Sequence, residues 1–177
     1  MTTRQIAEAL QRVATVLQRK PEMGLHDDAP ASARWSSGMR FVASHPNGMQ
    51  MATDMPTELG GSGDQVTPGW LFRAGLASCS ATSIMMAAIA AGVELTLLEV
   101  EAASRSDTRG LLGMNDADGE PVYGGPGDLR LSVRIAAAGV EPARLRGIVE
   151  AGVGRSPVPN VVSHATPLAL HIDVVAG

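Results

Sequence analysis

The stretch LFRAGLASCSATSIMMAAIAAG, residues 71–92, decides how this chain folds. It contains the only cysteine, Cys79, and no charged residue follows its arginine. Thr67 is a suitable N-cap, and Pro68 suits the first helical position. Gly92 stands where a left-handed C-terminal cap belongs. The pattern predicts a buried helix that is apolar on every side, so other elements must cover it.

Composition argues against a membrane or a nucleic acid as a partner of this chain. About 20 apolar residues can span a membrane, but residues 74–93 include seven Ala, two Gly, three Ser and one Thr, which leave little strongly hydrophobic surface. The net charge is −4 and no cluster of Lys or Arg occurs. We therefore predict a soluble protein that binds neither a membrane nor nucleic acid. A single cysteine also excludes a disulfide within the chain.

The N-terminus predicts an amphipathic helix. Ile6, Leu10, Val13 and Leu17 recur at steps of three and four among polar residues, and Pro21 ends the pattern. This segment lacks the uninterrupted apolar run of a secretory signal. We divide the chain into an N-terminal helix and linker, residues 1–32, and one domain, residues 33–177. The missing signal and the unpaired cysteine predict a cytoplasmic protein.

The remaining periodicities predict strands and one more helix. Asn47-Gly48 lies between two short apolar runs and is a strong hairpin signal. Alternating or β-rich runs predict strands, and a stripe of spaced apolar residues after Pro142 predicts a helix. The resulting fold class is α+β, without internal repeats. The strands are expected at 94–104, 129–137 and 168–175, and the helix at 142–154.

Common metal and nucleotide motifs are absent from the sequence. The run MNDADGE resembles a calcium loop, but Met114 occupies the first ligand position and Gly125 the closing one. The four histidines show no metal-ligand spacing, and one cysteine cannot build a structural zinc site. We expect neither a metal nor a cofactor.

The segment MATDMPTELGGSGDQVTPGWLFRAGLASCSA, residues 51–81, resembles the OsmC/Ohr family of osmotically induced and organic-hydroperoxide-resistance proteins. It is similar in the Asp-x-Pro run, the Gly-Gly-x-Gly turn and the Pro-led helix that ends in a cysteine. The later segments EAGVGRSPVPN and LALHIDV resemble the family's second-cysteine region and terminal strand. The resemblance covers roughly residues 33–175. It implies long buried central helices, antiparallel-rich sheets that cover them, and an intertwined homodimer with its cleft between the subunits.

The resemblance also implies a two-cysteine peroxidase site. A thiolate on the long helix, here Cys79, attacks the peroxide and becomes a sulfenic acid, and a second cysteine condenses with it. An arginine held by a glutamate activates the first thiolate. This chain departs from that pattern at two positions, because Gly69 stands for the glutamate and Ser156 for the second cysteine. The chain is an atypical member with one cysteine.

The activating arginine is open between two candidates. Arg40 precedes the FVAS run and is the first choice, with Arg34 as the alternative. Arg73 is nearer to Cys79 in sequence, but six residues turn a helix by about 240°. Arg73 should therefore face away from Cys79 within one subunit. If the family's cleft is retained, Ser156 should lie beside Cys79.

These residues favour three functions. The first is a one-cysteine hydroperoxide reductase in which Cys79 reacts with a small hydrophobic hydroperoxide and an external thiol restores it. The alternative is a non-enzymatic protein that binds a small hydrophobic ligand at the dimer cleft, with Cys79 as a buried core residue. The third is an interaction protein whose dimer surface is the function. The first is the interpretation that we adopt.

Overall fold

The computed structural model describes residues 2–175 and confirms the α+β class. Two antiparallel sheets are present, one of three strands and one of two. The helices are α1 (Thr3–Arg19), α2 (Pro68–Ala90), α3 (Thr108–Leu111), α4 (Pro142–Gly154) and α5 (Pro157–Ser163), with short 3-10 turns η1 (Pro21–Gly24) and η2 (Thr57–Leu59). The strands are β1 (Ser32–Ser37), β2 (Arg40–Ser44), β3 (Gln50–Thr53), β4 (Leu97–Arg105) and β5 (Gly127–Ala136).

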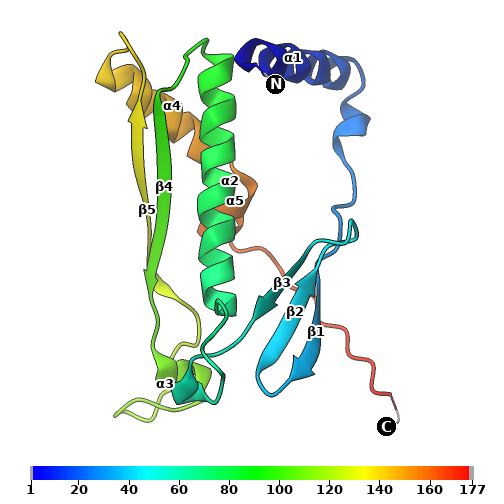
Figure 1. Cartoon of the computed structure of the whole chain (residues 1–177), viewed down its shortest axis with the longest axis vertical. Coiled ribbons are helices and arrows are strands. Elements are labelled where there is room, and N and C mark those ends of the chain that lie inside the picture. Colours follow the sequence, from blue (N-terminus) through cyan, green and yellow to red (C-terminus); the bar gives the residue numbers. More distant parts are fainter. Residues whose placement is uncertain (1, 176–177) are drawn as a thin grey trace.

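Helix α2 runs down from the top of the molecule, beside the β4–β5 pair, and ends above α3 (Figure 1). Its predicted ends are confirmed: the Thr67 hydroxyl accepts a hydrogen bond from the Trp70 backbone N–H at 3.1 Å, and Pro68 opens the helix. Gly92 follows the last turn with a φ of 66°, a conformation that a side chain would disfavour. Helix α2 is long and apolar enough to cross a membrane, but the core helix of a soluble protein can be equally long and apolar.

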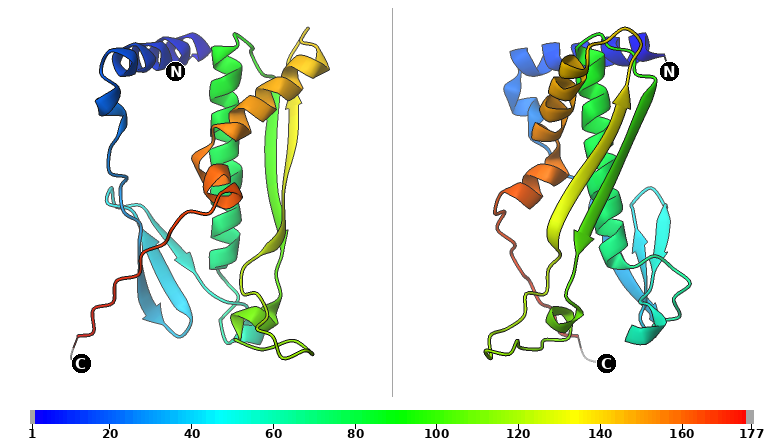
Figure 2. Two further views of the ribbon diagram at one scale, coloured as in Figure 1. Left: turned by 180° about the vertical axis from the view of Figure 1, so that it is seen from behind. Right: turned by 90° about the vertical axis from the view of Figure 1, so that its left-hand side faces the viewer.

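The hydrophobic core lies where α4 and the β4–β5 pair pack on α2 (Figure 2). Gly152 of α4 allows the two helices to approach closely, because a Cβ there would lie 2.6 Å from Cα of Ile84. The short helix α5, which the sequence did not predict, adds a further contact to α2. The buried core residues are Ile84, Ala87, Ala88, Val93, Leu145 and Ile148.

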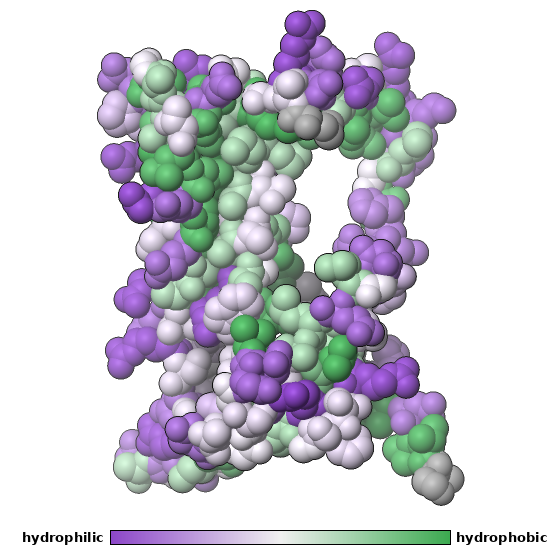
Figure 3. Space-filling model, viewed as in Figure 1, coloured by the Kyte–Doolittle hydropathy of each residue, from purple (hydrophilic) through white to green (hydrophobic). Residues whose placement is uncertain are grey.

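The opposite face of α2 remains exposed within the single chain. The elements of residues 2–175 therefore cover α2 only in part, since Met85 and Met86 keep 38% and 44% of their surface exposed. Figure 3 shows an opening beside this face, between the body and the arm formed by α1 and its linker. Helix α1 touches only the last part of α2 and buries none of its residues fully.

The three-stranded sheet extends the predicted hairpin. Strands β2 and β3 pair antiparallel around Asn47-Gly48, and Gly48 takes a φ of 91°, so this prediction is confirmed. Strand β1 adds to the other edge of β2. Strand β1 was not predicted from the sequence, and all six of its residues are exposed.

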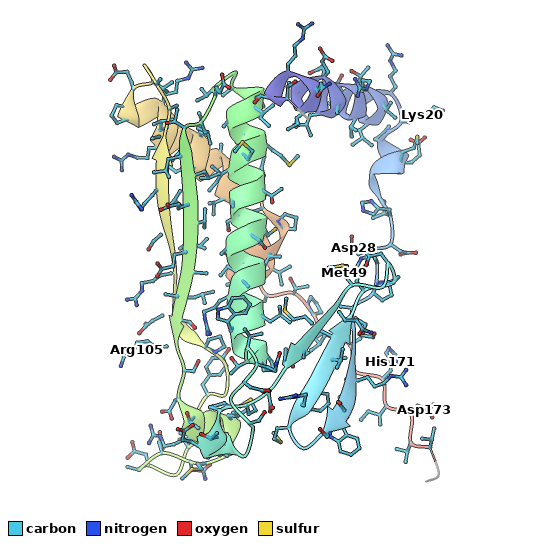
Figure 4. All side chains as sticks on the ribbon, viewed as in Figure 1. Lys20, Asp28, Met49, Arg105, His171 and Asp173 are labelled. Carbon is cyan, nitrogen blue, oxygen red and sulfur yellow. The ribbon has the colours of Figure 1, made fainter. Side chains whose placement is uncertain are left out.

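The strand predicted at 168–175 is wrong within this chain. The segment is extended but pairs with no strand of the described residues, and it leads away from the body at His171 and Asp173 (Figure 4). Solvent reaches 77–94% of the surface of Leu168, Leu170 and Ile172. An isolated strand cannot satisfy its backbone groups or cover its apolar face without an edge to join.

The other predicted elements are confirmed with small shifts. The predicted strand 94–104 begins at Leu97, because the chain must first turn after α2. The expected strand 129–137 and helix 142–154 correspond to β5 and α4. The division of the chain into residues 1–32 and 33–177 stays a prediction, because no observation tests it.

Candidate active site

Cys79 lies at the middle of α2 and faces the start of α5. The Ser156 hydroxyl donates a hydrogen bond to Sγ of Cys79, with an oxygen–sulfur distance of 3.2 Å. Ser156 is fully buried and the cysteine is half-buried. The structure thus brings together the lone cysteine and the position at which the family resemblance expects a second one.

The backbone between α4 and α5 holds Ser156 in place. Its N–H donates to the Val153 carbonyl at 3.0 Å, and its extended conformation (φ −76°, ψ 123°) is the one favoured before Pro157. A serine that precedes a helix usually caps it through its side chain, but Ser156 makes no such bond. Its hydroxyl is directed to the Cys79 sulfur instead.

Asn160 is a positioning residue that the sequence analysis missed. Its side-chain amide donates to the carbonyls of Ser156 at 2.9 Å and of Gly154 at 3.1 Å. These two bonds tie the turn before α5 to the first turn of that helix. A polar residue four positions after the serine was the only available signal, and that signal is common in helices.

Arg40 belongs to a separate polar network. Its guanidinium donates to the Ser62 hydroxyl at 2.7 Å, to the Asp54 carboxylate at 3.3 Å and to Asp64. Within residues 2–175 none of its hydrogen-bond partners is Cys79. A role for Arg40 in activating the cysteine therefore stays a prediction. Arg34, the alternative, lies on β1 opposite Val42.

This network fixes the turn that leads into α2. The Ser62 hydroxyl, the backbone N–H groups of Met55 and Ser62, and Arg40 lower the pKa of Asp54 to about 2, although desolvation opposes them. The Asp64 pKa is lowered chiefly by the same hydroxyl and by Arg40, and Asp64 in turn raises the Arg40 pKa. All three groups are charged at neutral pH, so the site around Arg40 has no excess positive charge to offer.

The fold and the site now allow a comparison with known proteins. Residues 61–171 match the family model for OsmC-like proteins. The chain belongs to the OsmC-like family. Two solved structures resemble it in fold: an OsmC-like protein from Mycoplasma pneumoniae (17% identity, TM-score 0.65, 80% of this chain and 91% of that chain) and an organic hydroperoxide resistance protein from Legionella pneumophila (20%, 0.54, 78% and 90%).

A third structure is more similar in sequence. It is a putative organic hydroperoxide resistance protein from Vibrio cholerae, with captopril bound in one of its active sites (26% identity, TM-score 0.54, 80% of this chain and 89% of that chain). No curated protein matches the chain. The predicted resemblance to the OsmC/Ohr family is confirmed, and so is the single cysteine of an atypical member.

Gly69 opens a space beside Arg73 on this OsmC-like helix. A Cβ at Gly69 would lie 3.7 Å from Nη1 of Arg73, and the same nitrogen donates to the Ser104 hydroxyl on β4 at 3.3 Å. Arg73 thus faces β4, whereas Cys79 faces α5, in agreement with the helical geometry. A glutamate introduced at position 69 would therefore begin next to the Arg73 guanidinium.

Proposed function

We propose that this OsmC-like protein is a thiol-dependent hydroperoxide reductase that uses Cys79 as its only redox-active cysteine. One observation carries the proposal: the half-buried Cys79 sulfur contacts Ser156 at 3.2 Å, in a chain whose family includes organic hydroperoxide resistance proteins. The sulfur thus lies next to a hydroxyl donor and no second thiol. A hydroxyl that donates to sulfur stabilises negative charge there, as the attacking thiolate and the sulfenate both require.

The proposed cycle balances with two external thiols. The Cys79 thiolate attacks one peroxide oxygen, the O–O bond breaks, and a proton reaches the departing alkoxide, which leaves as an alcohol. Cys79 is then a sulfenic acid. An external thiol attacks the sulfenic sulfur, water leaves, and a mixed disulfide forms. A second thiol releases the reduced Cys79 and carries away the oxidised thiol pair.

Because residue 156 is a serine, the reductant must be an external thiol. The Ser156 hydroxyl cannot form a disulfide, so the oxidised sulfur waits at the α2–α5 contact until a thiol arrives from outside. Because Cys79 is only half-buried, a small thiol has access to it. The substrate that we propose is a small hydrophobic hydroperoxide, since the side chains around this part of α2 are apolar or small.

We further propose that the active form is a cytoplasmic homodimer without a nucleic-acid or membrane partner. Three features support the dimer: the exposed apolar face of α2, the unpaired segment after α5, and a three-stranded sheet that packs little on the core. A second copy could cover all three at once. The cytoplasmic location is supported by the unpaired cysteine alone.

The decisive experiment measures organic hydroperoxide consumption with a monothiol reductant. The parent protein should turn over cumene hydroperoxide, and Cys79→Ser should lose this activity completely. Treatment with one equivalent of peroxide and dimedone should add one dimedone to Cys79, detectable by intact mass. Ser163→Ala, an exposed change at the far end of α5, is the matched control. A parent protein whose Cys79 stays reduced under excess hydroperoxide would overturn the proposal.

A further inference from the structure

A cavity lies at the opposite end of α2 from the core, below the Cys79 site. It has a volume of about 470 Å³ and is formed by the turn before α2, the first two turns of α2 and the loops around α3. Those segments meet at the lower end of the molecule (Figures 1 and 2). Cys79 does not line it. Its apolar side chains are Met55, Pro56, Leu59, Pro68, Phe72, Leu111 and Pro126.

Arg73 is the only arginine or lysine in the lining of this cavity. Its one hydrogen-bond partner within residues 2–175 is the neutral Ser104 hydroxyl, at 3.3 Å, and no described carboxylate lies within ion-pair distance of it. A half-buried guanidinium against apolar side chains gains most from an anionic partner, because the surroundings screen the charges less than water does.

The one acidic group of the lining is already paired. Asp107 accepts hydrogen bonds from the Arg109 guanidinium, the shortest at 2.6 Å, and from the Arg109 backbone N–H at 3.0 Å. These bonds lower the pKa of Asp107, so it carries its charge together with that of Arg109. The unbalanced charge of the cavity is therefore the positive one on Arg73.

Gly69 keeps this positive charge accessible. The space beside Nη1 of Arg73, where a side chain at Gly69 would begin, is empty of protein atoms closer than 3.7 Å. A glutamate there would stand four residues before the arginine, the spacing at which opposite charges pair on a helix. With glycine, this turn of the helix supplies no carboxylate, and the position is open to the carboxylate of a ligand.

We propose that this cavity binds an anionic amphiphile, a medium-chain carboxylate, with its carboxylate on Arg73 and its alkyl chain against the apolar lining. The volume lies within the roughly 300–1,000 Å³ of small-molecule sites, and a mostly apolar wall with one charged anchor is typical of them. The proposal does not rest on the redox role of Cys79, because that residue does not line the cavity.

Titration calorimetry with decanoate on the full chain tests this proposal, with decanol as the uncharged ligand of equal length. Decanoate should bind saturably at one site per chain and more tightly than decanol. Arg73→Gln should weaken decanoate binding about tenfold or more, since one charge-assisted pair is lost. Equal affinity for decanoate and decanol, or no saturable binding of decanoate, would overturn the proposal.

Variants at position 69 separate the charge effect from the space effect. Gly69→Glu should weaken decanoate binding as strongly as Arg73→Gln, because its carboxylate takes the guanidinium. Gly69→Gln, of the same size but neutral, should retain most of the affinity. Equal losses in both variants would contradict a carboxylate site. Cys79→Ser should bind decanoate as the parent does, so a failure here leaves the hydroperoxide test intact.

Discussion

The half of this molecule built on α2, α4, α5 and β4–β5 is packed, whereas the half built on α1, β1–β3 and the C-terminal segment is not. The packed half contains every buried apolar residue of the described chain. In the other half, only Thr53 and Asp54 are buried, and both are polar. A single chain therefore completes one core and leaves the second set of surfaces uncovered.

This difference in packing explains which parts of the candidate site are already in contact within one chain. Cys79 and Ser156 come from α2 and the α4–α5 turn, so their contact exists before any partner binds. Arg40 belongs to the loosely packed half, where its contacts are polar and local. If Arg40 activates Cys79, as the family resemblance predicts, it would have to reach the cysteine across the two halves or from a second subunit.

Ser156→Cys should give the largest effect, because it links two elements of the packed half. Hydroperoxide should convert Cys79 and the new cysteine to a disulfide within one chain, seen as a loss of two hydrogens by intact mass. The bridge closes a loop of 77 residues, and such loops add about 4 kcal/mol to the free energy of unfolding. Ser163→Cys, exposed at the far end of α5, should form no such bridge. A crosslink only between chains would show that the 3.2 Å contact is wrong.

Gly152→Ala should damage the same half by nearly as much. The new Cβ would lie 2.6 Å from Cα of Ile84 and 2.9 Å from its Cγ1, so the two helices must separate. Urea unfolding should show a loss of about 2–3 kcal/mol. The matched control is Gly147→Ala in the same helix, which meets no atom within 4 Å. Gly147→Ala should raise the free energy of unfolding by up to about 1 kcal/mol. A similar loss in both variants would show that the effect arises within α4 and not from its contact with α2.

Leu170→Asp tests whether a second copy completes the loose half. Leu170 is 79% exposed in the single chain, so a charge there costs nothing in a monomer. In a homodimer that buries this segment, the dimer dissociation constant should rise about tenfold or more. Light scattering across a dilution series measures it. His171→Asp, on the other side of the extended segment, should have little effect. Unchanged dimerisation in Leu170→Asp would remove the segment from the interface.

Asp54 gives the smallest effect and a pH dependence. Its pKa is about 2 in the folded protein, below its value in the unfolded chain, so it stabilises the fold fully above about pH 4. That contribution is lost as pH falls through the folded-state value. Asp54→Asn should therefore lower the Tm at pH 6, and the difference from the parent should shrink between pH 4 and pH 2. Asp27→Asn, exposed in the linker, should show no such trend.

Local patterns predicted most helices and strands well. Caps at Thr67 and Gly92, the proline after α1 and the Asn47-Gly48 turn act within a few residues, so the sequence alone locates them. The strand at 168–175 was predicted from the same kind of alternation and does not form, because a strand exists only with a paired edge. Strand β1 shows the converse, since pairing with β2 made a strand where no pattern did.

For the candidate site too, some features follow from the sequence alone and others only from the tertiary structure. The sequence by itself determined that Cys79 is the only thiol, that it sits on an apolar helix, and that Ser156 prevents a resolving disulfide. Only the tertiary structure decided that the Ser156 hydroxyl reaches the sulfur, that Arg40 is bound in another network, and that Gly69 exposes Arg73. Residue types and short spacings are local properties. Contacts between positions 77 residues apart depend on how α4, α5 and α2 pack, which no local pattern encodes.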